Sequence, residues 1–286
     1  MRSTKEWEVR GVRKPRLPFR SWTVVALVIG ALVASSALTQ QSVAQSVVTV
    51  MTAKLMEPNQ KTPEVSTDEL FKILADRSAT VFDARPRLEY AVSHIPGALN
   101  VAPKPGVPMS LYVSDVNEIG RILGGNKDTP IVLYCNGPFC GKSKRLGDEL
   151  VAGGYTNVRR YQLGIPTWRA LVGLTAIELE GALYVFRGDK TAVFIDARDP
   201  QEFKAGTIPG ARNLPDRLVL PGKDVGEVAK AKDDGRLPME DHNTRIVVIG
   251  KDSAQARHVA EAIAREAFHN VAYFVGTFDT LKSVIR

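Results

Sequence analysis

The sequence is poor in cysteine: it contains only two, Cys135 and Cys140, five positions apart. A disulfide between them would close a very short loop. Because the stabilisation that a crosslink provides falls with loop length, a purely structural disulfide is a weak explanation for them. Histidine is also scarce. Of the four histidines, only His94 lies in the half of the chain that contains the two cysteines. Two cysteines at this spacing without a nearby histidine make a poor zinc site, so we predict no metal and no other cofactor.

A strong positive charge is missing from most of the chain. The formal net charge is +7, but residues 1–20 alone carry seven basic and two acidic side chains. Residues 21–44 contain no Asp, Glu, Lys or Arg, so the net charge from Gln45 onward is only +2. This charge is too small to indicate a nucleic-acid surface, and no nucleic-acid partner is expected.

The N-terminal segment has the three parts of a secretory signal peptide. Its basic stretch is followed by an apolar run over residues 22–38 and then by the small residues of Ser42-Val43-Ala44. Residues 1–44 are therefore predicted to be a signal peptide that exports the protein to the periplasm. The alternative is an uncleaved membrane anchor, since roughly 17 apolar residues are at the short limit for crossing a bilayer. In both cases only this segment contacts the membrane.

The remaining sequence contains one pattern twice. Residues 81–102 read VFDARPRLEYAVSHIPGALNVA, and residues 194–215 read FIDARDPQEFKAGTIPGARNLP. The shared residues recur at a constant offset of 113, which is too long for a solenoid repeat and indicates a duplicated domain. We predict an exposed lead-in over residues 45–63, a first domain over 64–174 and a second domain over 175–286.

Each copy alternates short strands with amphipathic helices. In the first copy ATVFDA, IVLYC and NVRRYQL are predicted strands, the pair Ser66 and Glu69 predicts a capping box, and KSKRLGDELVA is a predicted helix. In the second copy AVFIDA, RIVVIG and NVAYFV are predicted strands, SAQARHVAEAIAREA is a helix, and TAIELEGALYVF is the expected opening helix. This alternation predicts an α/β fold in which each domain has a parallel sheet flanked by helices on both faces.

At this point the chain resembles the rhodanese-like family of sulfurtransferases, in both halves. The resemblance is carried by Asp83-Ala84-Arg85, by HIPGALN at residues 94–100, by the strand and cysteine of IVLYC, and by GYTNVRRYQLGIPTW. It implies tandem rhodanese-like domains, with the reactive cysteine on the loop between a central strand and the next helix. It also implies a two-step transfer, in which a cysteine persulfide forms and is then discharged.

By this resemblance Cys135 is the catalytic residue that carries the persulfide. The sulfur would come from a small anionic donor such as thiosulfate and pass to a thiol or cyanide-like acceptor. The residues expected to form the substrate and persulfide loop are Asn136, Gly137, Phe139, Cys140, Gly141, Lys142 and Ser143. The position itself supports the assignment, because loop amides and a helix N-terminus at the carboxyl end of a parallel strand favour an anion. The cations of Lys142, Lys144 and Arg145 are close enough in sequence to contribute.

The second copy lacks this chemistry. It has Gly250-Lys251-Asp252 where the first copy has Cys135-Asn136-Gly137, and its following segment is shorter by two residues. The second domain is therefore predicted to be inactive, with a structural or binding role.

Some residues have more than one interpretation. Asp83 and Arg85 are candidate supporting residues together with Arg145, but the first two recur in the copy without a cysteine, which favours a contact that holds the fold. Arg159 and Arg160 could face an anionic substrate or solvent. Related phosphatases place an arginine where this chain has a glycine, at residue 141, so the bidentate phosphate clamp is missing and phosphatase activity is not predicted.

Cys140 departs from the pattern of most relatives and leaves the function open. It is either a resolving thiol that forms a disulfide with Cys135 or a small buried side chain. Three functions therefore stand: an exported sulfurtransferase, a periplasmic thiol–disulfide or persulfide relay that uses both cysteines, and a non-catalytic binding module. The intact cysteine loop argues against the third. Because an oxidising compartment endangers a lone reactive thiol, a reducing protein partner is expected.

Overall fold

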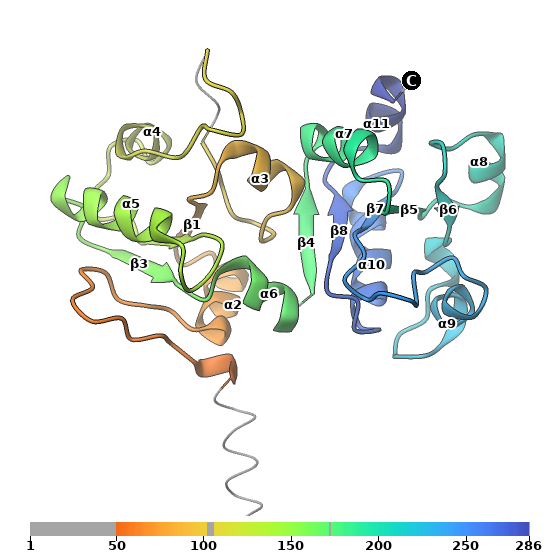
Figure 1. Ribbon diagram of the computed structural model, residues 1–286, viewed down its shortest axis with the longest axis horizontal. Coiled ribbons are helices and arrows are strands. Elements are labelled where there is room, and N and C mark those ends of the chain that lie inside the picture. Colours follow the sequence, from red (N-terminus) through yellow and green to blue (C-terminus); the bar gives the residue numbers. More distant parts are fainter. Residues whose placement is uncertain (1–49, 102–105, 172, 286) are drawn as a thin grey trace, which may run out of the picture. The chain divides into compact units, whose positions relative to one another are not determined.

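The computed structural model describes residues 50–101, 106–171 and 173–285 (Figure 1). The predicted signal peptide or anchor therefore lies outside the described residues. Within the described ranges, none of the helices has both the length and the apolar composition needed to cross a membrane.

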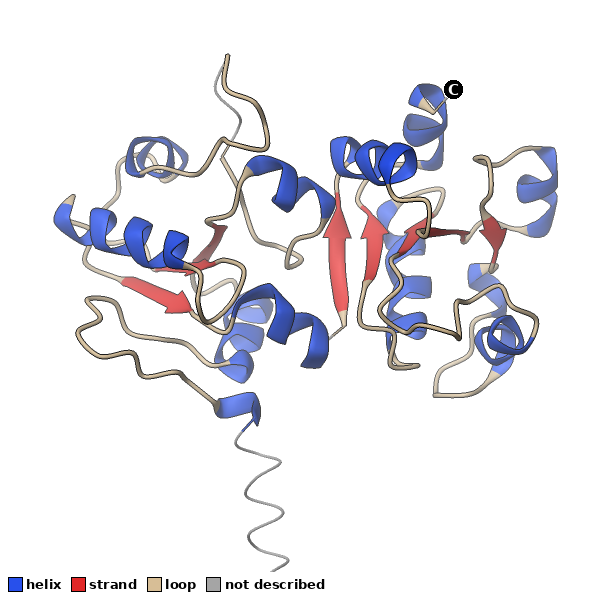
Figure 2. Ribbon diagram, viewed as in Figure 1, coloured by secondary structure: helices blue, strands red, loops and turns tan. Residues whose placement is uncertain are grey.

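The first domain has three parallel strands between helices (Figure 2). Their order is β1-β2-β3, so β2 is central. The strands are β1 (Thr80–Asp83), β2 (Ile131–Tyr134) and β3 (Val158–Tyr161). The helices are α2 (Thr67–Asp76), α3 (Arg87–Val92), α4 (Val116–Ile122), α5 (Gly141–Ala152) and α6 (Gly164–Leu171).

The second domain has a five-stranded parallel sheet in the order β4-β8-β7-β5-β6. Its strands are β4 (Leu174–Ile177), β5 (Val193–Asp196), β6 (Arg212–Asn213), β7 (Ile246–Ile249) and β8 (Val271–Phe274). Its helices are α7 (Leu179–Gly188), α8 (Pro200–Ala205), α9 (Gly226–Asp233), α10 (Ser253–Ala264) and α11 (Phe278–Val284), with a 3₁₀ turn η1 (Asp216–Leu218). The predicted α/β architecture is confirmed in both domains.

Each sheet is buried on both faces, which explains why its strands read as continuous apolar runs. In β2, Ile131 and Leu133 pack with residues of α4 and α5, whereas Val132 and Tyr134 pack with residues of α2 and α6. All four are completely buried. Since successive strand residues point to opposite faces, the residue after Tyr134 returns to the α5 side of the sheet.

The start of α2 is confirmed by its capping box. The backbone N–H of Glu69 donates to the Ser66 hydroxyl at 3.5 Å, and the backbone N–H of Ser66 donates to the Glu69 carboxylate at 2.7 Å. Two amides that would otherwise have no acceptor are satisfied, so the helix begins directly after Ser66.

The predicted opening helix of the second domain is wrong over its first residues. Leu174–Ile177 is the buried strand β4, which pairs in parallel with β8, and the helix α7 begins only at Leu179. The Thr175 hydroxyl donates to the Val271 carbonyl at 3.0 Å, which further attaches the strand to its neighbour. The prediction failed because a short buried strand and the start of a buried helix have the same apolar pattern.

The segment predicted to be an exposed lead-in is attached to the first domain over its described part. Thr62 is 1% exposed, and its hydroxyl accepts a hydrogen bond from Arg160 Nε at 2.8 Å. The Glu57 carboxylate lies 3.2 Å from Arg160 Nη2. Arg160 is completely buried, and a buried guanidinium requires hydrogen-bond partners and a countercharge. The segment is held in place because it supplies them, and of the two predicted environments Arg160 does not face solvent.

The two domains are joined by backbone pairing and helix packing. His94 and Ala176 exchange two backbone hydrogen bonds, of 3.0 and 2.9 Å, so a loop of the first domain pairs with β4. The Trp168 indole N–H donates to the Leu174 carbonyl at 2.9 Å. Helices α3 and α7 are in close contact, and a Cβ on Gly181 would lie 2.0 Å from the Ala91 carbonyl oxygen.

The pH dependence of stability should report on His94. Burial lowers the pKa of this ring to about 4, so the folded chain keeps it neutral. In the unfolded chain the ring is protonated near pH 6.5. The free energy of unfolding should therefore be highest above that pH and fall by up to about 3 kcal/mol as the pH drops to 4. In urea unfolding, the wild type should lose more stability between pH 7 and pH 4.5 than His94→Gln. Equal losses in the two proteins would contradict this assignment.

Candidate functional site

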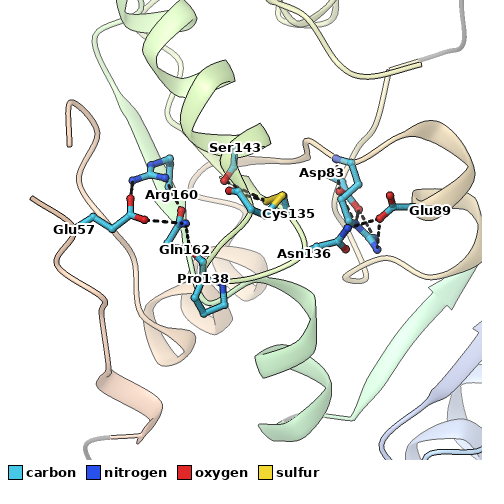
Figure 3. Close-up of a disulfide and its surroundings, with 11 residues drawn as sticks. Glu57, Asp83, Glu89, Cys135, Asn136, Pro138, Ser143, Arg160 and Gln162 are labelled. Carbon is cyan, nitrogen blue, oxygen red and sulfur yellow. Dashed lines mark hydrogen bonds and ion pairs between the residues drawn. A yellow bond between two sulfur atoms is a disulfide. The ribbon is translucent and has the colours of Figure 1, made fainter. Parts of the chain in front are cut away.

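Cys135 lies where the central strand of the first sheet ends. Strand β2 ends at Tyr134 and α5 begins at Gly141, so residues 135–140 form the loop between them (Figure 3). Cys135 is 2% exposed and packs in the apolar cluster on the α5 side of the sheet, with Phe82 among its members. The carboxyl end of a central parallel strand is the place where α/β proteins bind ligands.

Cys135 and Cys140 are joined by a disulfide, with their Cα atoms 6.4 Å apart. Of the two interpretations of Cys140, the structure agrees with a disulfide partner. Cys140 is partly exposed, whereas Cys135 is buried. The Phe139 side chain between them in the loop is fully exposed, at 102%. The described chain thus shows the oxidised form of the loop.

Two side-chain hydrogen bonds fix the loop from neighbouring elements (Figure 3). The Asn136 amide donates to the Glu89 carboxylate of α3 at 2.6 Å. The Gln162 amide, just after β3, donates to the Pro138 carbonyl at 2.9 Å. Gln162 also accepts a hydrogen bond from Arg160, the buried side chain that attaches the lead-in. The loop is therefore tied to α3 on one side and to the residue after β3 on the other.

Helix α6 begins against the same loop. The Ile165 N–H donates to the Cys135 carbonyl at 3.1 Å. The preceding residue, Gly164, has φ of +65°, and a Cβ there would lie 2.4 Å from both the Cys135 carbonyl oxygen and the Gly137 amide nitrogen. Only glycine fits this close approach without displacing the loop.

The N-terminus of α5 differs from its counterpart in the second domain. Cys140 is the N-cap residue of α5, and within the described chain its side chain makes no capping hydrogen bond. In the second domain the loop is only residues 250–252, and Asp252 caps α10 by accepting from the Gln255 N–H at 2.9 Å. A carboxylate therefore caps the helix N-terminus in the second domain, whereas the N-cap residue of α5 is a cysteine whose side chain makes no such bond.

The polar neighbours of Cys135 come from α5. The Ser143 hydroxyl lies 3.6 Å from Cys135 Sγ and can donate to it. Lys142, one residue earlier, is partly exposed on the first turn of the helix. Both residues belong to the predicted loop set, together with Gly137 and Gly141, and of this set the structure places the Ser143 hydroxyl beside Cys135 Sγ.

The other two predicted cations are engaged elsewhere. Lys144 Nζ lies 3.6 Å from the Glu57 carboxylate, and Arg145 Nη1 lies 2.7 Å from the Glu149 carboxylate on the next turn of α5. Arg145 is exposed, and its ion pair points along the helix surface. The expected contribution of Arg145 at Cys135 is therefore not seen in this form of the loop.

Asp83 and Arg85 form a buried ion pair, and its counterpart recurs in the second domain. Arg85 Nη2 lies 2.6 Å from the Asp83 carboxylate, and Arg198 Nη2 lies 2.7 Å from the Asp196 carboxylate. Burial alone would lower the pKa of Arg85, but the Asp83 carboxylate outweighs it and raises that pKa above its ordinary value. The predicted contact is present in both domains, with and without a cysteine.

Asparagines complete both strand ends. Asn100 and its repeat Asn213 each donate to the backbone carbonyls of the two ion-paired residues in their own domain, at 2.8–3.1 Å. Sequence reasoning noted this repetition but missed the role of Glu89 and Gln162 at the loop. Glu89 also recurs, as Glu202, which signals a structural role, whereas Gln162 carries no sequence signal.

A cavity of about 890 Å³ is located elsewhere, between α2, α6 and α10. Trp168 and Arg169 contribute to its lining, but Cys135 does not. Its lining includes no cysteine, so it is separate from the loop that carries the disulfide. Among the described residues, no group of three His, Cys, Asp or Glu side chains could hold a metal ion.

The chain belongs to the rhodanese-like domain family, whose model, described as "Rhodanese-like domain", matches residues 66–171 and 182–283. Among solved structures, the 3-mercaptopyruvate sulfotransferase SseA from Escherichia coli is 23% identical, with a TM-score of 0.30, over 76% of this chain and 99% of its own. A thiosulfate sulfurtransferase from Pseudomonas aeruginosa is 21% identical, with a TM-score of 0.29, over 77% of this chain and 44% of its own. No curated protein matches. The predicted tandem rhodanese-like domains are confirmed.

The close approach at Gly164 gives a stability prediction with an internal control. Gly164→Ala should lower the free energy of unfolding by about 2–4 kcal/mol, because the new Cβ meets the loop backbone at a positive φ. Gly141→Ala should change it by less than about 0.5 kcal/mol, since a Cβ there meets nothing within 4 Å. Urea unfolding measures both. Similar values for the two variants would refute this account of the loop.

The repeated ion pair predicts similar costs in both domains. Asp83→Asn and Asp196→Asn should each destabilise the fold by about 3–5 kcal/mol, because each leaves a buried guanidinium without its countercharge. Thermal and urea unfolding should show comparable losses. A large loss of stability in only one of the two variants would contradict this account of the repeated pair.

Proposed function

We propose that this chain is an exported sulfurtransferase whose nucleophile is Cys135. The main support is the contrast between equivalent loops in the two domains. In the first, a cysteine ends the central strand beside a helix N-terminus whose cap residue is Cys140. In the second, Gly250 takes the cysteine position and the Asp252 carboxylate caps the helix. Only the first loop offers both a sulfur nucleophile and a place for a second anion.

The proposed reaction has two displacement steps. The Cys135 thiolate attacks the sulfane sulfur of thiosulfate, an S–S bond to Cys135 forms, and sulfite leaves with the electrons of the broken S–S bond. A thiolate or cyanide acceptor then attacks the terminal sulfur, and Cys135 leaves as a thiolate. This covalent route divides one difficult transfer into two easier ones. The helix N-terminus and the Ser143 hydroxyl would stabilise the anionic sulfur in both steps.

The oxidised loop must be reduced before this cycle can begin. A disulfide contains no thiolate, and Cys135 and Cys140 are bonded in the described chain. We therefore include a reducing protein partner in the proposal. Export to the periplasm is supported by the signal-like pattern of residues 1–44, with retention as a membrane anchor as the alternative. The second domain would support the first without its own chemistry.

A second candidate function is thiol–disulfide exchange, and the disulfide itself favours it. In that case the loop would alternate between dithiol and disulfide and carry electrons rather than sulfur. A binding module without catalysis is the third outcome that an experiment must separate.

Intact mass spectrometry of the reduced protein after exposure to thiosulfate separates these functions. If sulfur transfer is correct, Cys140→Ser should gain one sulfur atom that cyanide removes, and Cys135→Ser should gain none. Wild type that loses two hydrogen atoms without any sulfur gain in the Cys140 variant would instead assign redox exchange. No mass change in any variant would favour the binding module. Circular dichroism spectra of both variants establish that they are folded.

A further inference from the structure

We infer that Cys140 is an internal acceptor, which discharges the sulfur carried by Cys135 as hydrosulfide. The inference rests on the proposed function and deepens it, because it names the acceptor, the product and the class of reductant. The observation behind it is that the two sulfur atoms are already bonded within the loop. The Cα separation of 6.4 Å lies within the usual range for disulfides, about 4.4–6.8 Å. No movement of either domain is needed to bring them together.

The geometry selects the inner sulfur of a persulfide as the atom attacked. In the described loop Cys140 Sγ meets Cys135 Sγ, which would be the inner sulfur once Cys135 is loaded. Attack there expels the outer sulfur, whereas attack on the outer sulfur would only move it to Cys140. Cys140 is also the N-cap residue of α5, where the helix N-terminus favours its thiolate form as the nucleophile.

The step balances in atoms and electrons. The Cys140 thiolate and the protonated Cys135 persulfide give the Cys135–Cys140 disulfide and hydrosulfide, and the persulfide proton leaves with the outer sulfur. The sulfane sulfur gains two electrons, and each cysteine sulfur loses one. Together with loading from thiosulfate, one turnover converts a dithiol protein and thiosulfate into a disulfide protein, sulfite and hydrosulfide.

The difference in exposure sets the order of re-reduction. Cys135 is 2% exposed, whereas Cys140 is partly exposed, so an incoming thiolate reaches Cys140 first. A mixed disulfide then forms at Cys140, and Cys135 leaves as a thiolate beside the Ser143 hydroxyl. The second thiol of a dithiol reductant displaces Cys140 and is itself oxidised to a disulfide. Cys135, which accepts sulfur in the next turnover, is therefore released as a thiolate before Cys140.

A purely structural bridge explains these observations less well. The disulfide closes a loop of only residues 135–140, and so short a crosslink adds little to stability. The same loop is already fixed by Asn136, by Gln162 and by the start of α6. The disulfide therefore constrains a loop that other contacts already hold. Its chemical consequence is that Cys135 is no longer available as a thiolate.

The test is a single turnover without any external acceptor. The full chain is reduced, freed of reductant under anaerobic conditions and mixed with thiosulfate. Released sulfide and the intact mass are then measured together, for wild type, Cys140→Ser, Cys140→Ala and Cys135→Ser. Wild type should release about one equivalent of sulfide per chain and end as the disulfide. Both Cys140 variants should release none and keep one added sulfur, and Cys135→Ser should do neither.

The two proposals fail in different ways. If the Cys140 variants gain a sulfur but wild type retains its sulfur and releases no sulfide, the internal acceptor is wrong and sulfur transfer stands. If the Cys140 variants release as much sulfide as wild type, Cys140 is again not the acceptor. If neither folded Cys140 variant gains a sulfur, the proposed function itself fails. Thermal unfolding of both variants identifies a result that comes from misfolding, and agreement between serine and alanine excludes an effect of the introduced hydroxyl.

Discussion

The buried ion pair between Asp83 and Arg85 is the contact on which both the cysteine loop and the domain junction depend. Arg85 also donates to the Ser93 carbonyl, which fixes the chain just before His94 pairs with the second domain. Glu89, 3.9 Å from the same guanidinium, holds the loop that carries the cysteines. A buried charge is costly unless it is paired and fully hydrogen-bonded, so these partners are required together. One guanidinium thus helps to position both the cysteine loop and the domain junction.

Because the Asp–Arg pair recurs in both domains of one chain, its structural role can be distinguished from that of the cysteines, which occur only in the first. Both domains keep the strand, the Asp–Arg pair and the asparagine that locks it, so this set serves the fold. The domains differ after their central strands. The loop after β2 comprises residues 135–140, whereas the loop after β7 comprises only residues 250–252. In the shorter loop the Asp252 carboxylate accepts a hydrogen bond from the Gln255 amide, so this helix N-terminus already has an anionic partner.

The sequence was sufficient for most of the fold and for placing Cys135 at the end of a central strand. Buried strands appear as continuous apolar runs, and Ser66 marks a helix start by local chemistry, so both were predicted correctly. Residues 174–177 were misassigned because four buried residues fit a strand and a helix equally well. The disulfide of Cys140 and the contacts of Gln162 could not be predicted from the sequence. Both depend on distances between segments that a periodic pattern does not contain.

The pairing of His94 with β4 also protects the outer side of the second sheet. β4 is an edge strand, and an uncovered edge presents free N–H and C=O groups to which strands of other chains can add. The first domain occupies this edge at Ala176 through two backbone hydrogen bonds. The second domain therefore depends on the first to keep this edge from pairing with other chains. Cleavage of the chain between the two domains would expose the β4 edge to pairing with strands of other chains.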